Sequence, residues 1–222
     1  MSIRNTIKSL DFFTTLSDEE LNSLAQISTV NSYKQNYILS YEKGETDKLI
    51  FLVDGLAKSY KIDKHENEIF LFHIYKNSML SEISNINDDK LHFFSNISFL
   101  DDSKILCIDY EAFKNTFLKN NILNMEFTSE ILVKSQQMKS LINREFIFDA
   151  VTKVAMMIDS DLDIFNKLKR YDISLMLHIQ PSTLSRVLNR LKKNNIIDIV
   201  QGKISVLDKQ NLEMIYKESS YE

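Results

Sequence analysis

The sequence is poor in the residues that most often interrupt or cross-link a chain. Its 222 residues include one cysteine, one proline, three glycines and no tryptophan. With Cys107 alone, one chain cannot form a disulfide, a cysteine zinc cage or a four-cysteine iron-sulfur cluster. Because Cys107 lies in an apolar segment, we expect a buried small hydrophobic residue in a reducing, cytoplasmic protein.

Long hydrophobic runs are missing too. No stretch of 18 apolar residues occurs, and the N-terminus lacks the apolar stretch of a signal peptide. We therefore expect neither membrane insertion nor secretion. Since 44% of the residues are apolar, the chain can still bury the core of one large domain or two modest ones.

An excess of positive charge is absent, because the formal net charge is −4. The charge is unevenly distributed: residues 1–148 hold 16 basic and 21 acidic side chains, and residues 149–222 hold 11 and 10. Within residues 167–193, seven basic residues stand against one acidic residue, Asp172. Such a segment indicates either a contact with nucleic acid or an ordinary solvated helix face.

Catalytic motifs are also absent. The chain has no Gly-rich phosphate loop, no nucleophile elbow and no HExxH pair. We therefore do not expect an enzyme.

Two kinds of pattern divide the first half of the chain. Residues 2–30 have helical spacing, with Ser17 and Glu20 placed as a capping box. From about residue 32 to 108 the pattern is that of short strands, predicted at 37–41, 49–53, 57–62, 68–74, 93–99 and 104–108. Gly44, Gly55 and Gly202 are all expected in hairpin turns, most clearly Asp54-Gly55. Closely spaced short strands are typical of a β-barrel or jelly roll.

A long helix is predicted over 121–148, a stretch without glycine or proline. Its apolar seam, spaced by four and three, passes through Phe127, Ile131, Met138 and Leu141. A helix of this length would extend about 42 Å, more than one small barrel can cover. We expect two chains to pair through this seam, the alternative being a helix packed along its own domain.

The C-terminal part, 149–222, has the outline of a winged helix-turn-helix. A helix over 172–177 and a turn at 178–180 precede a second helix over 181–193, which begins at the only proline. Strands at 198–200 and 203–207 then form a hairpin around Gly202.

The helix over 181–193 is amphipathic, and its polar side chains are of the kinds that bind DNA. Arginine can donate two hydrogen bonds to a guanine edge in the major groove, and serine or threonine can bond bases or phosphates. The predicted DNA contacts are Ser182, Thr183, Ser185, Arg186, Arg190, Lys192 and Lys193.

Almost the whole chain resembles the bacterial cAMP receptor protein and FNR (Crp/Fnr) family of transcription regulators. The similar segments are LDFFTTLSDEELNSLA, YEKGETDKLIFLVDGLAKSY, MLSEISNI, CIDYEAF and STLSRVLNRLKKNNII. The resemblance implies an α+β fold: a cyclic-nucleotide-binding-like β-roll over 1–120, a dimerisation helix over 121–148, and a winged helix-turn-helix over 149–222. It also implies a homodimer, double-stranded DNA with a palindromic operator, and RNA polymerase as partners, and leaves activation and repression both open.

Arg186 falls on the family's arginine that reads guanine in each half-site. Pro181 and Ser182 depart from the residues usual before Thr183, so the resemblance implies different inner operator bases. His178 falls on a turn position often occupied by glycine, which requires a residue that tolerates positive φ.

We do not expect cAMP as the effector, because the chain departs from the residues that bind it in the family. Members that bind cAMP hold the cyclic phosphate with a Gly-Glu-Leu segment and an Arg-Ser pair, where this chain has residues 81–83 (Ser-Glu-Ile) and Phe93-Phe94. Without the arginine, the pocket lacks its charge-assisted contact with phosphate. The N-terminal cysteine cluster of iron-sulfur members is also missing. Haem with nitric oxide, a small apolar ligand or no effector remain, with His73 as the candidate haem ligand ahead of His65 and His92.

Together these patterns predict a dimeric, sequence-specific DNA-binding transcription regulator. The alternative is a β-roll module for ligand binding or interaction whose helix-turn-helix no longer reads an operator.

Overall fold

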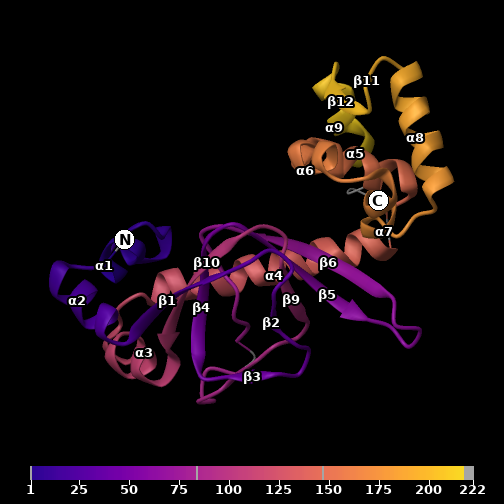
Figure 1. The fold of residues 1–222 in the computed structure, drawn as a ribbon. Helices are drawn as coiled ribbons and strands as arrows, with labels where there is room; N and C mark the ends of the chain where they lie inside the picture. The colour runs from indigo at the N-terminus through magenta and orange to yellow at the C-terminus, as the bar shows by residue number, and fades with distance from the viewer. Residues whose placement is uncertain (1, 84, 147, 218–222) are drawn as a thin grey trace. The chain divides into compact units, whose positions relative to one another are not determined.

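The computed structural model describes residues 2–83, 85–146 and 148–217, of which 144–146 are described by backbone alone. It consists of two compact units, Met1–Gln137 and Met138–Glu222, and the boundary falls within α4 (Asn124–Phe146) (Figure 1). Residue 147 of the predicted long helix lies outside the described residues. No helix in the described part of the chain combines the length and apolarity needed to cross a membrane.

The first unit begins with short helices. They are α1 (Ile3–Lys8), the 3-10 helix η1 (Asp11–Phe13) and α2 (Asp18–Gln26). The predicted capping box is confirmed, because Ser17 Oγ accepts from the Glu20 amide while the Glu20 carboxylate accepts from the Ser17 amide. The helical pattern ends earlier than predicted, since residues 28–33 form a strand. Its alternating polar and apolar residues suit strand pairing better than a further helical turn.

Two antiparallel four-stranded sheets form the β-roll, residues 28–109 (Figure 1). The first sheet has the order β1 (Ser28–Tyr33), β10 (Ser103–Asp109), β4 (Lys48–Asp54), β7 (Ser78–Met79). The second has the order β2 (Ile38–Ser40), β9 (Asn96–Phe99), β5 (Leu56–Ile62), β6 (Glu68–Tyr75). A short ribbon joins β3 (Glu45–Thr46) to β8 (Leu91–His92). The predicted β-roll is confirmed.

The Asp54-Gly55 turn is not the hairpin that was predicted. β4 and β5 follow each other in the chain but belong to different sheets, so Gly55 is a corner between sheets. Its φ of +100° requires glycine, and a Cβ there would meet Ser103 Oγ at 2.2 Å. The sequence signal marked the turn correctly, but pairing depends on contacts with β9 and β10 that lie about 40 residues further along.

Alternation along the first sheet divides its side chains between two cores. Ile50 and Leu52 face the second sheet, together with Ile105 and the buried Cys107. The intervening residues, such as Phe51 and Leu106, pack under the N-terminal helices and under α3 (Tyr110–Thr116), η2 (Leu118–Asn120) and the start of α4. The first sheet is therefore a layer between the interior of the β-roll and a cap made of these helices.

Phe127 belongs to this cap and not to an exposed seam. It is 3% exposed, and its ring centroid lies 6.2 Å from that of Phe113 on α3. The first turns of α4 lie against α3 because both apolar faces need cover. The prediction that Phe127 takes part in an interface between chains is therefore wrong.

The second unit has the predicted helix-turn-helix and hairpin, with further helices before and after them. Its elements are α5 (Ala150–Ser160), α6 (Leu162–Lys167), α7 (Arg170–Met176), α8 (Pro181–Lys193), β11 (Ile197–Val200), β12 (Lys203–Val206) and α9 (Lys209–Lys217). The last helix was not predicted. Its Leu212 is fully buried, so α9 completes the core that α5 and α8 share.

Because Phe51 packs under the helical cap, we expect its removal to lower the stability of the fold strongly. This ring is fully buried, with centroids 4.9 and 5.2 Å from those of Phe12 and Phe13. We expect Phe51→Ala to lower the free energy of unfolding in urea by about 3 to 5 kcal/mol. The control, Phe94→Ala, removes a ring that is 40% exposed and should cost about 1 kcal/mol or less. Equal costs for the two variants would contradict this assignment of the core.

Candidate DNA-binding interface

The turn between α7 and α8 holds the two helices at a fixed spacing. His178 has a φ of +51°, which confirms that a position often held by glycine lies in the left-handed region here. Ser174 on α7 is fully buried, and its hydroxyl donates to the Tyr171 carbonyl at 2.7 Å. A small side chain that satisfies its own hydroxyl lets α8 pack closely against α7.

The apolar stripe of α8 determines which residues face outward. Its members are Leu184, Val187, Leu188 and Leu191, each at most 6% exposed. They pack against α5, α7 and β11 in the core of the second unit. Pro181 stands at the first helical position, where the missing N–H leaves no hydrogen bond unmade.

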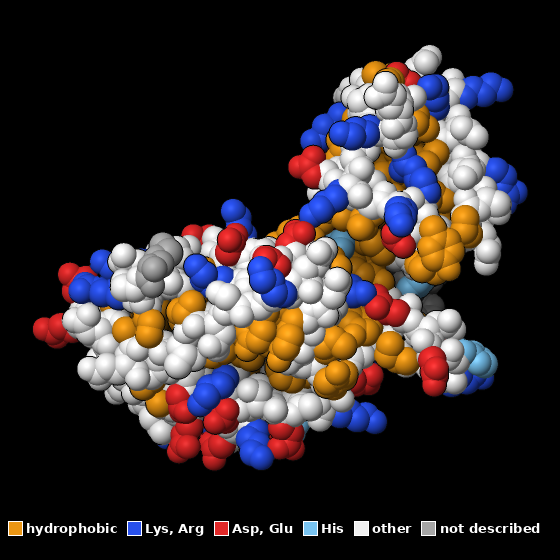
Figure 2. All heavy atoms as spheres, in the orientation of Figure 1, with side chains coloured by type: hydrophobic (Ala, Val, Ile, Leu, Met, Phe, Trp, Pro, Cys, Tyr) orange, Lys and Arg blue, Asp and Glu red, His pale blue; other side chains and the backbone are white. Residues whose placement is uncertain are grey.

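Opposite the stripe, one set of exposed polar side chains runs the length of α8. We call it the recognition face; it comprises Ser182, Ser185, Arg186, Asn189 and Lys193. Figure 2 shows Lys and Arg side chains on the outer edge of this unit, where Figure 1 places α8. Asn189 was missed from the sequence, although its spacing of three from Arg186 and seven from Ser182 places it on the same side of the helix.

Within the recognition face, Arg186 is oriented by its neighbour. Its Nη2 donates to Thr183 Oγ1 at 3.2 Å, one turn earlier on the helix. Thr183 is half-buried, so its hydroxyl orients the arginine more than it reaches outward. The Ser185 hydroxyl donates to the Pro181 carbonyl at 3.1 Å, which leaves its oxygen free to accept.

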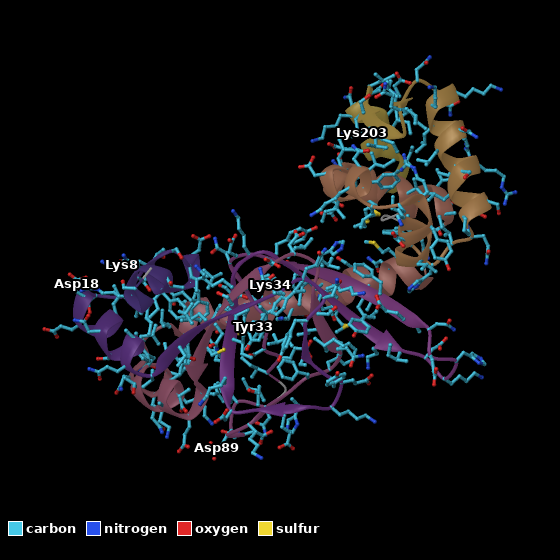
Figure 3. The ribbon with its side chains drawn as sticks, in the orientation of Figure 1. Lys8, Asp18, Tyr33, Lys34, Asp89 and Lys203 are labelled. Atoms are coloured by element: carbon cyan, nitrogen blue, oxygen red, sulfur yellow. The ribbon has the colours of Figure 1, made fainter. Side chains whose placement is uncertain are left out.

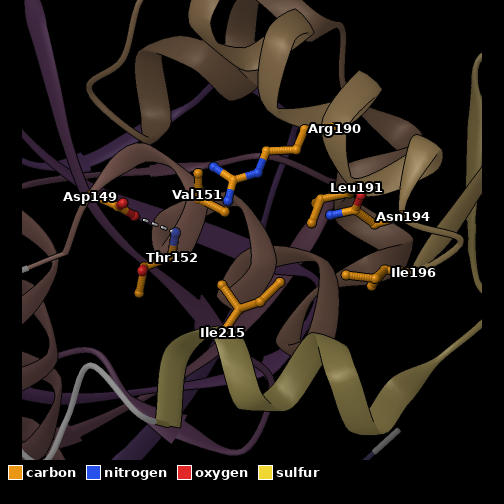
Figure 4. A pocket seen from close by; sticks show the side chains of 8 residues that line it. All are labelled: Asp149, Val151, Thr152, Arg190, Leu191, Asn194, Ile196 and Ile215. Atoms are coloured by element: carbon orange, nitrogen blue, oxygen red, sulfur yellow. Dashed lines mark hydrogen bonds between the residues drawn. The ribbon is translucent and has the colours of Figure 1, made fainter.

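Arg190 lies on the flank of α8 and its side chain extends toward the first turn of α5 (Figure 4). It lines a hollow of about 270 Å³ together with Asp149 and Val151. Asp149 caps α5, and the hydrogen bond from the Thr152 amide holds the pKa of its carboxyl below the usual value, with a smaller contribution from the charge of Arg190. Arg190 is thus placed beside the start of α5, away from the middle of the recognition face.

Lys192 occupies the other flank and binds the hairpin. Its Nζ lies 2.9 Å from the Asp198 carboxylate and donates to the Ile199 carbonyl at 3.3 Å. Of the seven predicted DNA contacts, Ser182, Ser185, Arg186 and Lys193 therefore share one outward face. Thr183 and Lys192 make contacts within the protein, and Arg190 lines the hollow beside α5.

In the β-roll, the positions that hold a cyclic phosphate in cAMP-binding relatives are filled by this chain's own contacts. Ser81 is fully buried, accepting from the Ile50 amide at 2.8 Å and donating to the Lys48 carbonyl at 3.2 Å. Phe93 is 6% exposed and packs between the sheets. The Phe94 amide donates to the Glu82 carboxylate at 3.0 Å.

Charged side chains of α4 lie close to this place. Burial lowers the pKa of Lys134, and the charges of Glu82 and Glu130 oppose that effect. Burial also raises the pKa of both carboxyls. Glu130 in turn accepts from the Met79 amide at 3.4 Å. This part of the β-roll therefore contains its own cation and two carboxylates.

The three histidines of the β-roll lie in different surroundings. His73 is 8% exposed on β6, and its ring meets that of Phe70 edge-on at 4.8 Å. His65 and His92 are exposed elsewhere on the β-roll. No group of three or more His, Cys, Asp or Glu side chains that could hold a metal ion occurs in the described part of the chain.

Comparison with known proteins agrees with this geometry. Residues 155–215 match the family model for the Crp-like helix-turn-helix domain, a segment that begins in α5 and ends in α9. No curated protein sequence matches the chain.

Solved structures extend the similarity to the whole chain. A protein from Eubacterium rectale, described as a transcriptional regulator of the Crp/Fnr family, is 17% identical with a TM-score of 0.66, over 95% of this chain and 99% of that one. A mutant of CooA from Carboxydothermus hydrogenoformans is 17% identical with a TM-score of 0.71, over 93% and 94% of the two chains. CLP of Xanthomonas campestris, described as a c-di-GMP responsive global regulator, is 11% identical with a TM-score of 0.63, over 86% and 99%.

At these identities the structures show a shared fold, and the family model identifies the C-terminal domain. The resemblance predicted from the sequence is thereby confirmed at both levels. Residues 155–215 form a Crp-like helix-turn-helix domain, and the chain as a whole has the fold of the Crp/Fnr family of transcription regulators.

Proposed function

We propose that this protein is a homodimeric transcription regulator that reads a palindromic DNA operator with α8. The observation that carries the proposal is the recognition face, where Arg186 stands exposed between serine hydroxyls, the Asn189 amide and the Lys193 ammonium. Guanidinium, amide and hydroxyl groups on one helix face match the donors and acceptors of base edges in the major groove. RNA polymerase is the further partner that such a regulator requires.

Pairing through α4 is the second part of the proposal. With Phe127 removed from the seam, Ile131 (39% exposed), Leu132 (58%) and Ile142 (51%) remain as large apolar side chains on one side of the helix. The half-buried Met138 lies on the same side, whereas the half-buried Leu141 lies closer to the buried side. A second copy of the helix would cover this surface and space two recognition helices about 34 Å apart, one turn of DNA.

Control by something other than cAMP is the third part. Phe93 and Phe94 supply no cation for a cyclic phosphate, and the hydroxyl of Ser81 is bonded within the sheet. His73 is buried with its ring against Phe70, which does not favour a bound haem. The proposal therefore keeps a non-cAMP effector and effector independence as the two forms of regulation.

One observation favours the alternative of a β-roll module without an operator. Arg190 and Lys192, both predicted to contact phosphate, extend toward α5 and the hairpin instead. The intact recognition face argues against this alternative, because a helix that no longer contacted DNA would have no need of five aligned polar and basic side chains.

The DNA-reading role is tested by selecting bound fragments from genomic DNA with the purified protein and with Arg186→Ala. We expect the wild type to enrich a palindrome with half-sites one turn apart. The variant should bind the selected site more weakly by about 1 to 3 kcal/mol and lose preference at one guanine per half-site.

Lys193→Ala is the control for charge alone. It should weaken binding to all sequences and reduce the salt slope of log K by about one. A loss of the same size on every sequence for Arg186→Ala would overturn the base-reading role, and the absence of any enriched site in the wild type would overturn operator binding without an effector.

The α4 surface is tested by a pair of substitutions two residues apart. Ile131 and Val133 are similarly exposed, at 39% and 43%, but point about 160° apart around the helix. We expect Ile131→Glu to convert the dimer to a monomer in sedimentation equilibrium, because two buried carboxylates would face each other. Val133→Glu should leave the dimer intact, and dissociation by both variants or by neither would contradict pairing through this side.

Exclusion of cAMP is tested by thermal unfolding of the whole protein. A ligand present at 100 times its Kd stabilises the folded state by about 2.7 kcal/mol, which shifts Tm by several degrees. We expect no shift with cAMP, since Phe93 and Phe94 supply no cation for the phosphate and Lys134 already interacts with Glu82 and Glu130. A concentration-dependent rise in Tm would show that the phenylalanines do not prevent cAMP binding.

A further inference from the structure

The wing, the β11–β12 hairpin of residues 197–206, is too small to hold its own position. Two strands of four residues are marginally stable in isolation, and this pair is joined by a two-residue turn with positive φ at Gln201 and Gly202. Ile197 and Ile204 anchor the base of the hairpin in the core. The turn is exposed, as Val200 at 60% shows.

Side chains of three helices attach the wing to the helix-turn-helix. From α6, the Asn166 amide donates to the Ile204 carbonyl at 2.9 Å and accepts from the Ile204 amide at 2.7 Å. From α8, Lys192 pairs with Asp198 at 2.9 Å. From α7, Arg170 Nη2 donates to the Gly202 carbonyl at 2.7 Å. The contact of Arg170 reaches the turn itself.

The guanidinium of Arg170 is held for this contact and is poorly placed for any other. Its central carbon lies 4.9 Å from the centroid of the Phe165 ring, whose side chain is fully buried. Its Nη1 is buried without a hydrogen-bond partner. Burial also lowers the pKa of the guanidinium, so the environment is costly for the charge. A residue whose purpose was to meet phosphate would keep this group in solvent.

What the wing presents is a basic side chain beside the turn. Lys203 is the first residue of β12, paired with Val200 and exposed, and Figure 3 labels it on the wing. Ammonium groups at such positions bind backbone phosphates as point charges, which requires that the turn be held in place.

We propose that Arg170 is a positioning residue that fixes the wing turn so that Lys203 contacts a DNA phosphate. The inference rests on the proposed function for the DNA contact itself. It assigns to Arg170 a role in DNA binding without a contact to DNA, and to the wing one phosphate contact per subunit.

The positioning is tested first in the free protein, without DNA. Hydrogen exchange of the wing peptides is compared between the wild type, Arg170→Gln and Lys169→Gln, the last being the exposed neighbour that makes no bond to the wing. We expect Arg170→Gln to accelerate exchange in residues 200–204 by about tenfold and Lys169→Gln to leave it unchanged. Unchanged exchange in Arg170→Gln would overturn the positioning role whatever the protein binds.

The phosphate contact is tested by a double-mutant cycle on the operator selected by the wild type. Arg170→Gln, Lys203→Ala and the double variant are titrated with DNA from low to high salt. Each single variant should flatten the slope of log K against log salt by about 0.9, and the double variant should flatten it no further.

Each other result rejects part of the inference. Additive losses would mean that Arg170 meets a phosphate by itself, and an unchanged slope in Lys203→Ala would remove the wing contact. If the slope changed in Lys203→Ala but not in Arg170→Gln, Arg170 would not position Lys203 for its phosphate contact. Should Arg170→Gln unfold, Arg170→Lys keeps the stem over Phe165 and enters the same cycle. A wild type that selects no operator would instead reject operator binding without an effector, while the exchange experiment still decides the positioning.

Discussion

Burial of one apolar stripe on α8 is the constraint on which the DNA-binding unit depends. Leu184, Val187, Leu188 and Leu191 repeat at helical spacing and fill the core shared with α5, α7 and α9. Burying four such side chains contributes about 1.5 to 3 kcal/mol each before entropy is subtracted, far more than any polar contact on the outer side. The helix cannot rotate without losing this packing. The side of the domain on which Arg186 lies therefore follows from the leucines, and its hydrogen bond to Thr183 then orients the guanidinium.

The same constraint explains why basic residues on one helix have different roles. Arg186 and Lys193 lie opposite the stripe and face solvent, whereas Arg190 and Lys192 lie at its two edges. A long side chain at the edge can lay its stem along the protein surface and carry its charge to a neighbouring element. Arg190 reaches toward the capped start of α5, and Lys192 reaches Asp198 on the wing. Helix geometry separates the charges that can approach DNA from those that hold the domain together.

The sequence predicted the local elements well and the contacts between distant elements poorly. The bounds of α8, the capping box at Ser17 and the positive φ at His178 depend on residues within one or two turns, and they were all confirmed. The Asp54-Gly55 turn and the burial of Phe127 depend on partners far along the chain, and both were misjudged. Four members of the recognition face were predicted, but Asn189 was missed although it lies on the same side of the helix. The roles of Arg190 and Lys192 at the edges of α8 could not be predicted, because a basic residue in a sequence can either contact phosphate or pair with a group of the protein.

The β-roll shows how a site can keep its fold while its chemistry changes. Glu82 remains in the loop where cAMP-binding relatives have a glutamate, but its carboxylate accepts from the Phe94 amide and lies near Lys134 of α4. Removing Lys134 alone would take from both partly buried carboxylates, Glu82 and Glu130, a cation that favours their charged forms, which costs more than the net worth of the interaction. Any ligand that entered here would have to compensate for the same charges. An anion that entered here would compete with Glu82 and Glu130 for Lys134.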